Sequence, residues 1–419
     1  MSPKFIYLVN AQRDDAWHPG EKRGHVNTLT QDSSTPGLVL RTVLHQGVAF
    51  RDQIAEATGL SAATIGRQVT ALVRRGLLRE RPDCTRSGHV GRPSIPVEVD
   101  DRLLATGAVH IGRLVTTVAV TDLHGRVLGV SHLPTRGNDA DLVKAAARRL
   151  IGLHAGIGDR TLIAAAVVAP WEALDRSPAV AGRTLRDTTT LPTSTADHVA
   201  AVAAADLLYS PEHGHGTTAY VYARETVGVA TVHDGVIPSG GRRTGSVTHL
   251  PTTSDAVCSC GARGCLGATV AAIGPRAAAA GLVERPDVEL VHAAALAGDL
   301  AAHALLVERA EHLGRAVAVV RDLLDPDRVV LAGQAFTAYP AAASVVLESF
   351  RRTTGLGPVP ITLSRFGAEV QAAAAGAIAL GPIYRDPLAA LDRHERLLQR
   401  TRNARRARTT NGAVRLQPA

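Results

Sequence analysis

The chain has 419 residues and a formal net charge of +8, from 46 lysines and arginines against 38 acidic residues. This length suits two or three domains, and no apolar run is long enough to cross a bilayer, which argues against a membrane protein. Four cysteines and no apolar secretory core at the start predict a cytoplasmic protein rather than a disulfide-rich secreted one.

Residues 1–35 have no continuous apolar pattern and are predicted to form a flexible leader. Three short helices are expected to follow. The third is capped by Ser61 and carries Ile65, Val69 and Leu72 on one face, while Gly59 ends the second. The predicted helices are Pro36–His45, Arg51–Thr58 and Ala62–Arg75.

Two helices joined by a short glycine-containing turn predict a helix-turn-helix, whose last helix would enter the major groove of DNA. Arg67 and Gln68 are the outward side chains long enough to reach base edges, while Thr64 and the arginines at the helix end suit phosphates. A protein-interaction module with a charged face is the alternative. The candidate DNA contacts on this helix are Ser61, Thr64, Arg67, Gln68, Arg74 and Arg75.

A wing is predicted directly after this helix. Leu77–Arg81 and Ile95–Val99 read as two strands, separated by a polar loop from Pro82 to Pro93. Arg86 and Arg92 lie in that loop, and a Gly-Arg-Pro tripeptide presents Arg92 on a slim backbone suited to a minor groove. Residues 36–102 are therefore predicted to be a winged helix-turn-helix DNA-binding domain.

Residues 103–385 alternate between strand and helix patterns, which predicts an α/β body. The expected strands are Thr116–Thr121, Val127–Val130, Leu162–Ala169 and Val329–Leu331, and the expected helices are Asp141–Leu150, Asp197–Leu208 and Ala372–Leu380. Residues 386–419 are predicted to be a flexible tail, although its leucines could continue a helix. From Arg385 onward there are nine arginines against three acidic residues, so the tail either attracts DNA phosphates or only solubilises the protein.

Three of the four cysteines lie within eight residues, in the run Cys258-Ser-Cys260-Gly-Ala-Arg-Gly-Cys265, and His249 precedes them. The two glycines between the thiols allow the chain to turn back so that both sides of the loop reach one ion. One His and three Cys fill a tetrahedral shell and predict a structural Zn²⁺ site without an open catalytic position. Free or disulfide-bonded thiols are the alternative.

The helix-turn-helix, the Gly91-Arg92-Pro93 wing and the His249/Cys258/Cys260/Cys265 signature together resemble the transcriptional regulators of the ROK family (repressor, open reading frame, kinase). The resemblance spans roughly residues 36–384. It implies a two-lobed, actin-like α/β body of the sugar-kinase type that forms a homodimer or homotetramer. It also implies regulators that respond on operator DNA to a bound sugar.

The ROK family that the chain resembles also contains kinases, but the phosphate-binding positions of this chain depart from the kinase pattern. His110 stands where kinases have the aspartate of an Asp-x-Gly loop, and 224–228 keeps only the last glycine of a glycine-rich loop. Asp197 aligns with the catalytic base, yet Ala196 replaces the preceding asparagine. Asp197 is either a remnant of that base or the N-terminal carboxylate of its helix. Kinase activity is therefore expected to be lost.

The sugar pocket implied by the resemblance is also altered, because Ser246 and Gly267 stand where the family has glutamates. The candidate effector-binding residues that remain are Asp197, Ser246 and His249. Three alternatives remain for the cleft: it accepts a different small molecule, it accepts a sugar through other residues, or it binds nothing. The sequence as a whole predicts a DNA-binding transcriptional regulator, a repressor rather than an activator. A ROK sugar kinase with an added DNA-binding domain and a protein-binding scaffold are the alternatives.

Overall fold

The computed structural model describes residues 33–85, 94–237 and 246–414. They form two compact units, of which one contains residues 33–212 and 371–414 and the other residues 213–370. Most of the predicted leader and the wing tip with Arg86 and Arg92 lie outside the described residues.

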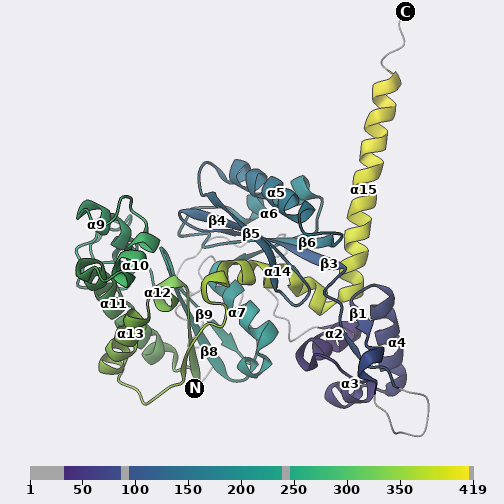
Figure 1. Cartoon of the computed structure of the whole chain (residues 1–419), viewed down its shortest axis with the longest axis horizontal. Helices are drawn as coiled ribbons and strands as arrows, with labels where there is room; N and C mark the ends of the chain where they lie inside the picture. The colour runs from purple at the N-terminus through teal and green to yellow at the C-terminus, as the bar shows by residue number, and fades with distance from the viewer. Residues whose placement is uncertain (1–32, 86–93, 238–245, 415–419) are drawn as a thin grey trace, which may run out of the picture. The chain divides into compact units, whose positions relative to one another are not determined.

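The first unit opens with the predicted helix-turn-helix, followed by a two-stranded wing base (Figure 1). Ser34 and Ser61 cap the first and third helices by accepting hydrogen bonds from backbone N–H groups three residues on. Ile54, Ile65 and Leu72 are fully buried where the helices meet. The first helix begins one residue earlier than predicted, and the third ends one residue earlier. The elements are α2 (Thr35–Gln46), α3 (Arg51–Thr58), α4 (Ala62–Arg74), β1 (Leu78–Glu80), η1 (Pro82–Cys84) and β2 (Val97–Val99).

A five-stranded sheet follows, in the order β5-β4-β3-β6-β7, where β3, β4 and β5 pair antiparallel and β6 and β7 run parallel to β3. The strands are β3 (Leu104–Ile111), β4 (Val115–Thr121), β5 (Val127–Pro134), β6 (Thr161–Ala169) and β7 (Thr193–Asp197). The helices of this unit are α5 (Asp139–Ala155), α6 (Pro178–Thr189), α7 (His198–Tyr209), α14 (Val370–Arg385) and α15 (Pro387–Val414).

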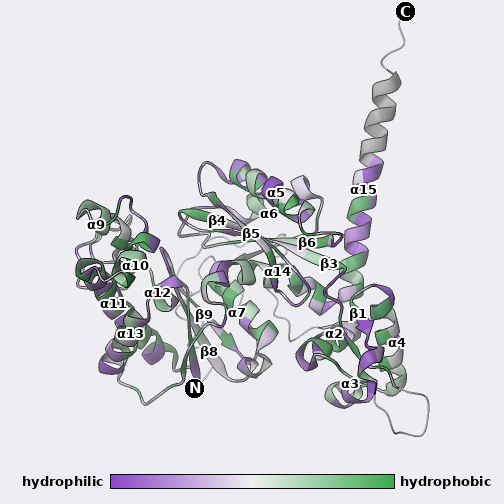
Figure 2. Cartoon of the chain, viewed as in Figure 1, coloured by the Kyte–Doolittle hydropathy of each residue, from purple (hydrophilic) through white to green (hydrophobic). Residues whose placement is uncertain are grey.

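Both faces of the central strands β3 and β6 are covered, which explains why these two strands are buried almost throughout. On one face, Val109 and Val167 pack with buried residues of α5 and α6. Gly107 allows that close approach, because a Cβ there would lie 2.5 Å from a methyl of Leu150 in α5. On the other face, the Tyr384 hydroxyl of α14 donates to the Leu123 carbonyl at 2.7 Å. Figure 2 shows the green of hydrophobic residues along α7 and purple recurring along α15.

The predicted tail begins as a helix, α15, which runs from Pro387 to Val414. This agrees with the expectation that its leucines could continue a helix. The first turns of α15 bury Leu391 and His394, and they contact α2 and β6. Tertiary packing thus stabilises a segment whose many arginines suggest a solvated end. The helix-turn-helix is held to the same unit, because the Ser34 N–H donates to the Arg385 carbonyl at 2.9 Å and His45 Nε2 lies 3.0 Å from the Leu208 carbonyl oxygen.

The second unit contains a four-stranded sheet in the order β11-β10-β8-β9, with β8 antiparallel to β9 and parallel to β10. Long helices α11 and α13 supply much of its core, including Leu313, Val317 and Phe350. The strands are β8 (Thr217–Ala223), β9 (Val227–His233), β10 (Arg328–Ala332) and β11 (Ile361–Leu363). The α-helices are α8 (Leu266–Ala271), α9 (Ile273–Ala279), α10 (Val288–Leu296), α11 (Leu300–Leu324), α12 (Gln334–Thr337) and α13 (Pro340–Thr353), and short 3₁₀ turns are η2 (Pro211–Gly214) and η3 (Gly367–Glu369).

The two mixed sheets with their helices confirm the predicted α/β class. Across the described ranges, no single helix is long and apolar enough to cross a membrane. Helices α10 and α11 reach the required length and hydropathy only as a pair, and they are bent by 120° at their junction.

Candidate DNA-binding surface and metal centre

The outer face of α4 carries the residues predicted to contact DNA. The Ser61 hydroxyl accepts from the Thr64 N–H at 3.3 Å, which fixes the first turn of the helix. Arg67 is exposed and donates through Nη2 to the Thr64 hydroxyl at 3.3 Å, while Gln68 is half-buried. Because Ile65, Val69 and Leu72 anchor the opposite face in the core, these polar side chains are held outward.

Carboxylates neutralise most arginines around this helix, but not those on its outer face. Arg79 and Arg81 are both paired with Glu98 at the wing base. Arg67 and Arg74 are exposed, and no carboxylate pairs with either among the described residues. The local positive charge is therefore concentrated on α4, where a phosphate backbone would lie if the helix entered a major groove.

Arg75 has a different environment from the one that the sequence suggested. It lies at the C-terminal end of α4, and its guanidinium forms ion pairs of 2.9 Å with Asp392 and 3.1 Å with Glu395 of α15. Both acidic residues lie more than 300 positions away in sequence, so no local pattern could have revealed the contact. The interaction connects the end of α4 to α15, and contact of Arg75 with phosphate stays a prediction.

His249, Cys258, Cys260 and Cys265 converge in the second unit, as the sequence predicted for a metal centre. Their ligand atoms all lie within 4.8 Å of one another. Cys258 Sγ is 3.7 Å from His249 Nδ1, and Cys260 Sγ is 3.7 Å from Cys265 Sγ. A tetrahedron with metal–sulfur bonds of about 2.3 Å has sulfur–sulfur edges of about 3.8 Å. The donor set and its spacing therefore fit a tetrahedral zinc ion.

Local backbone turns bring these four residues together. The Gly261 N–H donates to the Cys258 carbonyl at 3.0 Å, and the Cys258 N–H donates to the Ala262 carbonyl at 2.9 Å, which closes the loop between the first thiols. Gly264 has φ of 72°, and a Cβ there would lie 2.5 Å from the Ser254 carbonyl oxygen. Glycine is thus required where the chain turns toward Cys265 and the start of α8.

The surroundings of Cys258 and Cys265 shift the pKa values of the two thiols in opposite directions. The backbone N–H of Cys260 lowers the pKa of Cys258. Burial, followed by the neighbouring thiol of Cys260, raises the pKa of Cys265 to about 11. Three sulfurs this close repel one another as thiolates, so a divalent cation relieves the repulsion by displacing protons.

Asp197 caps helix α7, which is the second of the two roles that the sequence offered for this residue. Its carboxylate accepts from the Val199 N–H at 2.9 Å. Burial raises the pKa of Asp197, but the adjacent His198 and the N–H groups of Val199 and Ala200 outweigh it, so the pKa lies below its usual value. These contacts stabilise the carboxylate and make it a weaker proton acceptor. His110, at the end of β3, is buried, and its ring lies 6.4 Å from that of His198 in an edge-on arrangement.

In the second unit, residues 224–228 form the β8–β9 turn and the first two positions of β9. Arg224 pairs with Glu225 at 3.1 Å and with Glu289 at 3.2 Å. Arg309 is fully buried nearby, where it contacts His292 at 2.9 Å, and burial lowers its pKa to about 10. An ion-pair network with two carboxylates therefore stands where the resemblance implied a glycine-rich phosphate loop.

The candidate effector residues are divided between the units, with Asp197 in the first and Ser246 and His249 in the second. Ser246 is exposed, and a side chain at Gly267 would meet the Thr248 methyl at 2.6 Å. Whether Asp197, Ser246 and His249 bind one effector stays a prediction. Sequence reasoning missed a cavity of the first unit that arginines of α6 and α15 line.

The chain combines two classes of fold. Its two mixed β-sheets with their helices and its His–Cys₃ cluster define a sugar-kinase-type body, and the N-terminal winged helix-turn-helix is a nucleic-acid-binding fold. Residues 106–381 match the sequence profile of the ROK family. Transcriptional regulator Rv0485 of Mycobacterium tuberculosis is 38% identical over 396 residues, which cover 87% of this chain and 89% of that protein. The chain therefore belongs to the ROK family.

Other relatives agree with this assignment. The DNA-binding transcriptional dual regulator NagC of Escherichia coli is 31% identical over 111 residues, or 26% of each chain. A solved ROK family transcriptional regulator, described as a homologue of the E. coli MLC protein, matches 87% of this chain and 99% of its own with a TM-score of 0.64. A ROK family glucokinase from Streptomyces griseus matches 66% of this chain and 99% of its own with a TM-score of 0.57. Sequence identity to each solved structure is 20%, so these two likenesses concern the fold.

Proposed function

We propose that this protein is a DNA-binding transcriptional regulator, more specifically a repressor, that has lost kinase activity. The observation that carries the proposal is the outer face of α4, where Arg67 and Arg74 are exposed while the core anchors the helix from behind. Arg67 would read a base edge and Arg74 would contact phosphate. Relatives that match most of the chain and are named transcriptional regulators, such as Rv0485, support the same conclusion.

The metal centre has a structural role in this proposal. Zn²⁺ held by His249, Cys258, Cys260 and Cys265 would cross-link the loop that precedes α8 and keep it folded. Four protein ligands leave no open coordination position for substrate or water, so the ion would supply stability rather than catalysis. The three cysteines must remain reduced to bind the ion, which supports a cytoplasmic location.

The proposed absence of kinase activity rests on one position where ATP phosphates would bind and on the candidate general base. Glu225 and Glu289 add negative charge beside the β8–β9 turn, and phosphoryl transfer requires groups that neutralise phosphate charge. Asp197 is engaged as a helix cap with a lowered pKa, so it is poorly suited as a general base. A homodimer or homotetramer that responds to a small effector completes the proposal, in line with the body's kinship to the ROK family.

Selective DNA binding by the full-length chain tests the function. Genomic fragments recovered by the protein define an operator, and fluorescence anisotropy then gives its affinity and that of an unrelated duplex. Arg67→Ala should weaken operator binding by about 1–3 kcal/mol and leave unrelated DNA nearly unaffected. Arg183→Ala, an exposed arginine of α6, is the matched control. Equal affinity of the wild-type chain for all duplexes, or ATP turnover with a panel of sugars, would contradict the proposal.

A further inference from the structure

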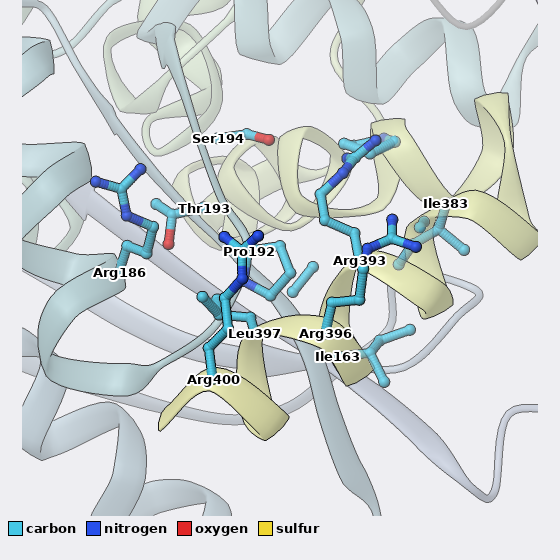
Figure 3. Close-up of a pocket in the computed structure, with 13 residues that line it drawn as sticks. Ile163, Arg186, Pro192, Thr193, Ser194, Ile383, Arg393, Arg396, Leu397 and Arg400 are labelled. Carbon is cyan, nitrogen blue, oxygen red and sulfur yellow. The ribbon is translucent and has the colours of Figure 1, made fainter. Parts of the chain in front are cut away.

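A cavity of about 280 Å³ lies in the first unit between strand β7, helix α6 and the two C-terminal helices (Figure 3). Arginines reach it from α6 and α15, and the hydroxyl residues Thr193 and Ser194 lie on β7. Apolar side chains, among them Ile163, Ile383 and Leu397, form the remainder of the lining. The four arginines that line it are Arg186, Arg393, Arg396 and Arg400.

The charge of this cavity is not balanced by its own lining, which contains no acidic residue. Outside the lining, Asp187 pairs with Arg186 at 3.5 Å, which leaves the three arginines of α15 as the main source of positive charge. Arg393, Arg396 and Arg400 are spaced three and four residues apart, so they share one face of α15, and like charges at this spacing repel one another. Figure 3 shows all three projecting from the same helix beside Pro192. The nearby acids of α15 are engaged elsewhere, because Asp392 and Glu395 pair with Arg75 of α4.

We propose that this arginine-lined cavity binds a small organic phosphate. Guanidinium groups form charge-assisted hydrogen bonds with phosphate oxygens. The Ser194 hydroxyl adds a neutral donor, whereas the Thr193 hydroxyl donates to the Leu191 carbonyl at 3.0 Å. The apolar lining would accommodate an uncharged organic portion, and the volume suits a small molecule rather than a nucleotide chain. Nothing in this site overlaps with Asp197, Ser246 or His249, the residues predicted to bind an effector.

Occupancy of the cavity would be communicated to the DNA-binding helix through α15. The same two turns of α15 present Arg393 and Arg396 to the cavity and Asp392 and Glu395 to Arg75 at the end of α4. A ligand that fixes the arginines would change how α15 holds α4, and so the affinity for DNA. This second step rests on the proposed function, whereas ligand binding does not.

Isothermal titration of the full-length chain with phenyl phosphate tests the cavity, with phenol as the uncharged match. The wild-type chain should bind phenyl phosphate saturably and phenol not at all. The double variant Arg396→Gln/Arg400→Gln should bind at least tenfold more weakly. The control Arg183→Gln/Arg402→Gln removes the same charge from exposed arginines outside the cavity and should stay within twofold. A lack of saturable binding by the wild type, or equal weakening by the control, would overturn the site.

Operator affinity, measured with and without phenyl phosphate, tests the coupling. A shift of threefold or more in the wild type, absent from Arg396→Gln/Arg400→Gln, is the expected result. Phenyl phosphate binding without any shift overturns the coupling. Weaker DNA binding by the double variant in a protein that does not bind phenyl phosphate would identify these arginines as DNA-backbone contacts and overturn the proposal. Failure of the wild type to bind any operator would instead overturn the proposed function, and the titration would still decide the cavity.

Discussion

Replacing Cys260 by alanine is the sharpest test of the metal centre, because this ligand is exposed whereas Cys258 and Cys265 are buried. Removing an exposed thiol leaves no internal cavity, and surface substitutions usually change stability by less than about 0.5 kcal/mol. Any large effect must therefore come from the lost metal ligand. Structural zinc sites are worth about 10–16 kcal/mol of apparent binding energy. One of four ligands then accounts for on the order of 3 kcal/mol, or about 150-fold in zinc affinity.

The assay is competition with a chelator of known affinity, followed by elemental analysis of the zinc retained on the full-length chain. Hydrogen exchange over residues 246–268 should accelerate in Cys260→Ala as the loop loses its cross-link. Cys84→Ala is the matched control, since this half-buried thiol lies outside the cluster and contacts Asp83. If Cys260→Ala retained zinc as tightly as Cys84→Ala, a metal held by all four residues would be ruled out.

Three other substitutions probe the rest of the structure. Arg74→Ala should weaken operator and unrelated DNA alike and reduce the slope of log affinity against log salt by about 0.9, the contribution of one phosphate contact; an unchanged slope would refute that contact. Gly37→Ala should lower the thermal midpoint, because a Cβ there would collide with the carbonyl oxygens of Tyr384 and Arg385; an unchanged midpoint in calorimetry would show that α2 does not pack against α14. Asp197→Ala should cost about 1 kcal/mol in urea unfolding through the lost cap of α7, and a neutral result would deny the carboxylate that role.

Local sequence patterns were sufficient wherever the structure depends on neighbouring residues. Gly59 ends α3, and Ser61 caps the start of α4. Ile65, Val69 and Leu72 then repeat at helical spacing. The helix-turn-helix was therefore predictable nearly to the residue. The metal cluster was predictable for the same reason. Three of its four ligands lie in one eight-residue loop, and the glycines within it allow the tight return of the chain that brings the thiols together.

Contacts between distant segments were decided by tertiary structure alone. Arg75 at the end of α4 forms ion pairs with Asp392 and Glu395 of α15, which lie more than 300 residues away in sequence. The sequence allowed the leucines of the tail to continue a helix, and the fold stabilises that helix, α15, by burying Ala390 and Leu391. The arginine-lined cavity requires β7, α6 and α15 to meet. Sequence spacing encodes which residues share a turn or a face, whereas the pairing of faces is set by packing the whole unit, so only the folded chain discloses it.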